Sequence, residues 1–127
     1  MTTFKSILIV EDDESVRSGL KLLFQEEGYP VLDAKHGQEA LDILKKKSSH
    51  KLGLILLDSK MPVMDGSSFL LELQRKHPKI LDLIPIFLTT GRSNFTNPVS
   101  IKTTGVLQKP FHMDELFKII TKYCGGA

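Results

Sequence analysis

Acidic side chains follow two apolar runs of the chain, at the points where buried strands should end. Glu11, Asp12 and Asp13 come directly after "SILIV", and Asp58 comes directly after "LILL". An aspartate is rarely buried unless it is paired, so Asp58 at such a position needs a chemical reason. Crowded carboxylates repel one another unless a cation is present, and oxygen ligands of this kind suit Mg²⁺. These acids therefore predict a magnesium-binding cluster.

A hydroxyl and an ammonium group follow two further apolar runs. Thr89 ends "PIFLT" and Lys109 follows "VLQ". An aspartate can attack phosphorus to form an acyl phosphate, and a lysine and a hydroxyl can then bind the new phosphoryl oxygens. Simpler interpretations stay open, because Asp12 or Asp13 could cap a helix, Thr89 could be an ordinary strand residue and Lys109 a surface charge. The hypothesis that Asp58 is a nucleophile depends on all of these residues sharing one edge.

The periodicity of apolar residues predicts the elements that position these groups. Short apolar runs predict five strands, at 6–10, 30–34, 54–57, 85–89 and 106–108. Helical spacing predicts four helices, at 15–27, 38–47, 67–76 (where "HP" should stop the helix) and 113–123. This alternation predicts an α/β fold with a doubly wound parallel sheet, because a parallel crossover needs a helix-length connection. Ligands of such sheets bind beyond the carboxyl ends of the strands, where the candidate residues stand.

Length and composition limit the classes of function. The chain has 127 residues, 41% hydrophobic and 25% charged, which is typical of one globular domain. The net charge of +2 is too small to indicate binding to nucleic acid, and the first apolar run is too short for a signal peptide or a membrane span. The single cysteine, Cys124, builds no disulfide framework, which fits the cytoplasm. We expect one domain over 1–127, with a disordered tail from 124 to 127.

Four motifs together carry a resemblance to a known family. The motifs "ILIVEDD", "LILLDSKMPVMDG", "PIFLTTG" and "LQKPF", in this order, resemble the response-regulator receiver domain of two-component signalling over essentially the whole chain. The resemblance implies a flavodoxin-like sheet of strand order 2-1-3-4-5. It implies that Asp58 accepts a phosphoryl group from a sensor histidine kinase or a phosphotransfer protein. A downstream protein effector would then detect the change.

The resemblance also implies a role for each site residue. Asp12 and Asp58 would contact Mg²⁺ directly, together with the backbone carbonyl of Lys60, and Glu11 would act through water. The spacing to Arg17 selects Glu11 and Asp12 as the acidic pair of the family.

The phosphoryl group would meet a hydroxyl and a lysine. The resemblance implies that Thr89 is the switch hydroxyl, and that Lys109 binds phosphate and pairs with Asp58 before phosphorylation. The family usually has Tyr or Phe at the position of Val106, where this chain has no ring. Between 91 and 105 most residues are poor helix formers, which predicts a short or irregular helix there.

Two alternatives stay open beside the signalling interpretation. A phosphohydrolase of the haloacid-dehalogenase type would carry a second aspartate two residues after the nucleophile, where this chain has Lys60. A degenerate receiver would bind partners without phosphorylation. The full acidic set disfavours this alternative, but the absence of an aromatic ring at Val106 leaves it open. We expect a stand-alone receiver that is no enzyme beyond catalysing its own phosphorylation and dephosphorylation.

Overall fold

Five parallel strands form the centre of the computed structural model, which describes residues 4–46, 51–61, 64–91 and 103–125. The strands are β1 (Ser6–Val10), β2 (Val31–Ala34), β3 (Leu52–Asp58), β4 (Ile86–Thr90) and β5 (Gly105–Gln108). They form one sheet of order β2-β1-β3-β4-β5, and every neighbouring pair is parallel. The predicted fold class and strand order are therefore confirmed.

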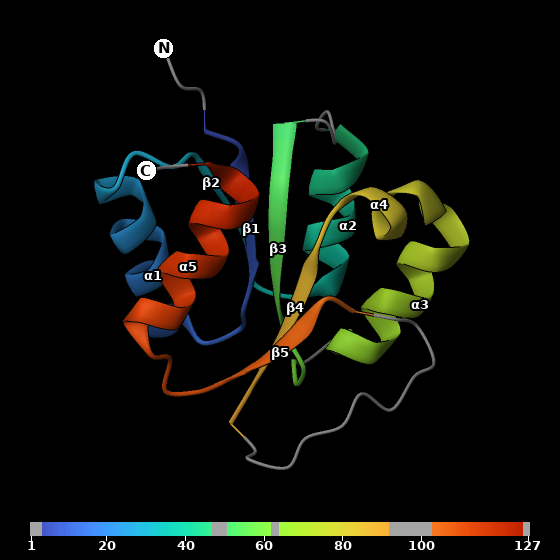
Figure 1. The fold of residues 1–127 in the computed structure, drawn as a ribbon. Coiled ribbons are helices and arrows are strands. Elements are labelled where there is room, and N and C mark those ends of the chain that lie inside the picture. Colours follow the sequence, from blue (N-terminus) through green and yellow to red (C-terminus); the bar gives the residue numbers. More distant parts are fainter. Residues whose placement is uncertain (1–3, 47–50, 62–63, 92–102, 126–127) are drawn as a thin grey trace.

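Helices cover both faces of this sheet (Figure 1). One face carries α1 (Glu14–Glu26) and α5 (Met113–Cys124), and the other carries α2 (Gly37–Lys46), α3 (Gly66–Lys76) and α4 (Pro78–Leu83). Successive side chains of β1 point to opposite faces, so that Ile7 and Ile9 pack with α1 and α5 while Leu8 and Val10 pack with α2 and α3. All seven residues of β3 are buried, which explains its apolar run without alternation.

Helix α4 is an element that the sequence analysis missed. The bounds of the predicted helices and strands differ from the observed ones by at most two residues. The "HP" pair, however, both ends α3 and begins a further helix. Pro78 is the first residue of α4, where the backbone N–H has no partner within the helix, so proline loses no hydrogen bond there. Ile80 of the same helix packs into the core. The prediction of an irregular helix between 91 and 105 concerns residues that lie mostly outside the described ones. None of the helices in the described ranges has the length and apolar composition needed to span a bilayer.

The end of α5 corrects the expectation of a disordered tail at residues 124 and 125, whereas 126 and 127 lie outside the described residues. Cys124 is the last residue of α5, is 2% exposed, and accepts a backbone hydrogen bond from Lys5 at 2.9 Å. The Tyr29 hydroxyl donates to the carbonyl of Gly125, and the Tyr29 ring stacks on Phe4. The apolar face of α5 therefore extends one residue further than predicted, because Cys124 packs as a small hydrophobic side chain.

Burial should protect Cys124 from thiol reagents. Burial raises the pKa of its thiol to about 12, so little reactive thiolate forms near neutral pH. We expect iodoacetamide at pH 8 to label the folded protein at least about 100-fold more slowly than the protein in urea. The label is measured by mass spectrometry over time. Equally fast labelling in both states would show that the end of α5 is not packed as described.

Candidate functional site

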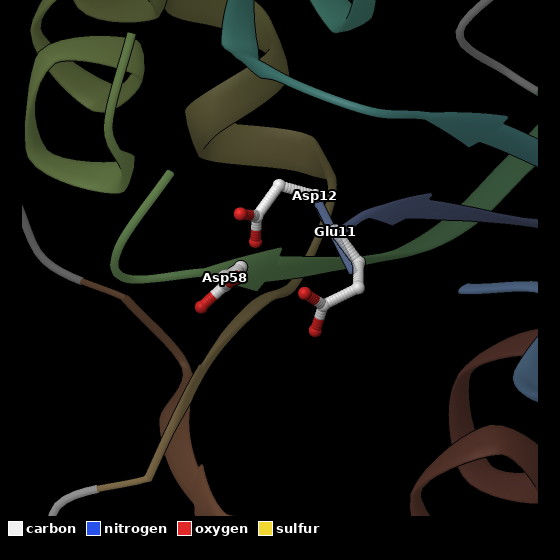
Figure 2. A group of neighbouring side chains, drawn as sticks. All are labelled: Glu11, Asp12 and Asp58. Atoms are coloured by element: carbon white, nitrogen blue, oxygen red, sulfur yellow. The ribbon is translucent and has the colours of Figure 1, made fainter. Parts of the chain in front are cut away.

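The carboxyl ends of β1 and β3 bring three carboxylates together (Figure 2). Glu11 and Asp12 follow β1, Asp58 ends β3, and one oxygen of each carboxylate lies within 4.8 Å of the others. The two strands are paired neighbours with Val10 opposite Leu57, so the residues that follow them also lie side by side. Glu11 and Asp58 are buried and Asp12 is exposed. The predicted acidic cluster is therefore present in the fold.

Asp13 has a different role from the two acids before it. Its carboxylate accepts hydrogen bonds from the hydroxyl and backbone N–H of Ser15 and from the backbone N–H of Val16, which makes it the N-cap of α1. The Ser15 hydroxyl and the Val16 N–H hold the pKa of Asp13 below its usual value. The capping interpretation thus applies to Asp13, and the selection of Glu11 and Asp12 agrees with the geometry.

Lys109 places an ammonium beside two of the carboxylates. Its Nζ lies 2.5 Å from a Glu11 oxygen and 3.7 Å from an Asp58 oxygen. Burial by itself would lower the pKa of Lys109, but the hydrogen bond to Glu11 and the charge of Asp58 outweigh burial and raise it. The predicted pairing with Asp58 is present, although Glu11 is the closer partner. Lys109 therefore stays charged and offsets part of the negative charge.

Asp58 is a buried acid whose negative charge is only partly offset by its neighbours. It is 5% exposed, and the backbone N–H of Lys60 donates to its Oδ1 at 3.2 Å. Burial, followed by the hydrogen bond and charge of Glu11, raises the pKa of Asp58 to about 8, and Lys109 only partly opposes this. The site thus presents an excess of negative oxygen ligands with one exposed member, and this set of donors fits Mg²⁺ with water ligands retained.

The last two residues of β4 form backbone hydrogen bonds with the residues that follow β3 and β5. Thr89 is 3% exposed and lies beside Asp58 in the register of β3 and β4. Its carbonyl accepts the Ser59 N–H at 2.9 Å, and the Thr90 carbonyl accepts the Lys109 N–H at 2.7 Å. Backbone bonds to two successive residues of β4 therefore hold the segments that carry Asp58 and Lys109.

Two glycines allow close packing around the loop after Asp58, one against β3 and one against α2. A Cβ on Gly66 would lie 2.7 Å from the carbonyl oxygen of Asp58, which is too short a distance for any side chain. A Cβ on Gly37, at the start of α2, would lie 2.9 Å from Met64 of the same loop. Gly66 is the last residue of the motif "LILLDSKMPVMDG", which carries part of the family resemblance, whereas Gly37 had no signal in the sequence because its contact is long-range.

Comparison with known proteins shows what this chain is similar to. The family model for the response regulator receiver domain matches residues 7–121. Sporulation initiation phosphotransferase F of Bacillus subtilis is 35% identical over 123 residues, which are 94% of this chain and 93% of that protein. Sensor kinase CckA of Brucella abortus is 33% identical over 111 residues, which are 87% of this chain and 12% of that protein. The chain spans only 24% to 54% of several other curated relatives.

A solved structure resembles the fold closely. The response regulator TrrA of Thermotoga maritima, in complex with Mg(2+)-BeF, is 31% identical and superposes with a TM-score of 0.77. The superposition covers 94% of this chain and 98% of that one.

Metal-free protein should become less stable as the pH rises toward 8. The raised pKa of Asp58 means that the folded state binds a proton that the unfolded state has released between about pH 4 and pH 8. We expect the free energy of unfolding of Asp58→Asn, relative to that of the wild type, to rise between pH 5 and pH 8 by about 1–2 kcal/mol. Urea unfolding in EDTA measures this difference. A difference that does not grow with pH would contradict the raised pKa of Asp58.

Proposed function

The chain belongs to the response regulator receiver domain family, and on this premise we propose that it is the phosphoacceptor module of a two-component phosphorelay. Receiver domains of this kind are signalling phosphoacceptors rather than enzymes. We propose that Asp58 is the acceptor. The observation that carries the proposal is the convergence of Glu11, Asp12, Asp58 and Lys109 at the carboxyl edge of the sheet.

The chemistry follows from the position of Asp58. In the proposed reaction an oxygen of Asp58 attacks the phosphorus of a phosphohistidine. The new P–O bond forms as the N–P bond breaks, the imidazole leaves with the electron pair, and an acyl phosphate results. Lys109 lies 3.7 Å from Asp58 and would donate to the phosphoryl oxygens. Thr89, beside Asp58, would offer its hydroxyl to the same oxygens.

We propose Mg²⁺ as the cofactor of this site. Asp12, Asp58 and the backbone carbonyl of Lys60 would hold it directly, and Glu11 would act through water. The bound ion supplies positive charge that keeps Asp58 ionised and stabilises the phosphoryl oxygens. The oxygen donors of the cluster and the similarity to a protein solved with Mg(2+)-BeF support this assignment.

We propose a sensor histidine kinase or phosphotransfer protein as the donor and a protein effector as the reader. Similarity to a phosphotransferase and to part of a sensor kinase supports a place in such a relay. The net charge of +2 supports a partner other than nucleic acid, and the unpaired thiol of Cys124 suits the cytoplasm. We propose that residues 1–127 form one receiver domain that acts without contacting a membrane.

Labelling tests the acceptor directly. With Mg²⁺ and acetyl phosphate, we expect a phosphoryl mass adduct that maps to the peptide containing Asp58 and is absent in Asp58→Asn. Asp13→Asn is the matched control, because asparagine also caps helices and this variant should label normally. Unchanged labelling of Asp58→Asn would contradict the assignment. A folded wild type that never labels would favour the alternative receiver that binds partners without phosphorylation.

Metal binding should depend on Asp12. Asp12→Asn removes an exposed carboxylate of the cluster, so we expect about tenfold weaker binding of Mg²⁺. Isothermal titration calorimetry with MgCl₂ measures the affinity, and the rise of Tm with Mg²⁺ gives a second measure by mass action. Asp13→Asn should bind Mg²⁺ as the wild type does. Equal affinity of Asp12→Asn and wild type would exclude Asp12 as a ligand.

A further inference from the structure

Arg17 on α1 contacts the backbone of both acids that follow β1. Its Nη1 donates to the carbonyl oxygen of Glu11 at 2.9 Å and, more weakly, to that of Asp12 at 3.4 Å. Its Nε lies 3.3 Å from the carboxylate of Asp33 on β2. One guanidinium group therefore joins α1, β2 and the turn that carries the acidic cluster.

This contact differs from an ordinary surface ion pair. The Arg17 side chain is only 14% exposed, and its planar group directs separate N–H donors to two acceptors at once. Lys21, one turn further along α1, also pairs with Asp33 at 3.0 Å, but its side chain is 40% exposed. An exposed pair of that kind contributes little. Lys21 is therefore a natural control for the charge of Arg17.

The backbone of this turn decides where the carboxylates lie. Asp12 is exposed, so packing constrains its side chain less than it constrains the buried Glu11. The backbone N–H of Asp13 donates to Glu11 Oε2 at 3.1 Å, which couples the turn to the Glu11 side chain. Ligands of a metal must be held within about 0.5 Å of their productive geometry. A group that holds the two carbonyls thus influences both carboxylates.

We propose that Arg17, anchored by Asp33, is a positioning residue that fixes the turn of Glu11 and Asp12 and so strengthens the binding of a divalent cation at the acidic cluster. This inference rests on the proposed magnesium site. By charge alone, a guanidinium near the site would repel Mg²⁺, and its removal would tighten binding. Positioning predicts the opposite sign, because removal would let the turn relax.

Calorimetric titration with MgCl₂ at constant ionic strength separates the two effects. We expect Arg17→Gln to weaken binding about tenfold, as is typical for loss of a group that orients a metal ligand. Arg17→Lys should weaken it similarly, because an ammonium cannot reach both carbonyls and Asp33 as the guanidinium does. Lys21→Gln should change affinity less than about twofold. Wild-type affinity in Arg17→Lys, or tighter binding in Arg17→Gln, would overturn the inference.

Amide hydrogen exchange in EDTA gives a measure that needs no metal. We expect the Asp13 N–H to exchange faster in Arg17→Gln than in the wild type or Lys21→Gln, while the N–H groups of β3 keep their protection. Unchanged exchange at Asp13 would overturn the positioning role. A wild type that binds no Mg²⁺ would overturn the proposed magnesium site together with this inference, whereas equal binding by wild type and Arg17 variants would overturn the inference alone.

Discussion

Negative charge held at the carboxyl edge of the sheet is the constraint on which the rest of this structure depends. Glu11 and Asp58 are both buried there, and within the described part of the chain the ammonium of Lys109 is the cation that lies against them. Burial, followed by the neighbouring Glu11, raises the pKa of Asp58, because low-dielectric surroundings disfavour a charged carboxylate and strengthen repulsion between charges. The metal-free site therefore holds negative charge that is only partly offset, and a bound cation would offset more of it. Stability is given up locally where function requires it.

The parallel sheet makes this concentration of charge possible. Neighbouring parallel strands end at the same edge, so residues that are distant in sequence meet without any special loop. β3 is buried on both faces and supplies a rigid base for Asp58. Backbone bonds from Ser59 and Lys109 to β4, and the close approach at Gly66, hold the loops around it. The apolar packing of the helices on both faces thus resists the repulsion at the edge.

Two layers of interaction surround the carboxylates. Lys109 contacts the carboxylates of Glu11 and Asp58 directly. Arg17 acts on the backbone of Glu11 and Asp12 and is anchored to Asp33 on the edge strand β2. The first layer offsets charge and the second determines geometry. Two cations close to one cluster therefore have different proposed roles, since of the two only Lys109 faces the carboxylate oxygens that a metal or a phosphoryl group would meet.

The sequence by itself determined the α/β class, the approximate bounds of all five strands, and the convergence of Glu11, Asp12 and Asp58. These follow from local periodicity and from the rule that parallel strands end together. Only the tertiary structure decided that Glu11 is the closer partner of Lys109 and that Cys124 is buried. It also decided the contacts of Arg17 and the separate helix at Pro78. The first three features depend on distances between groups of different elements, and the separate helix depends on packing that overrides a local stop signal. Spacing along the chain encodes neither the distances nor the packing.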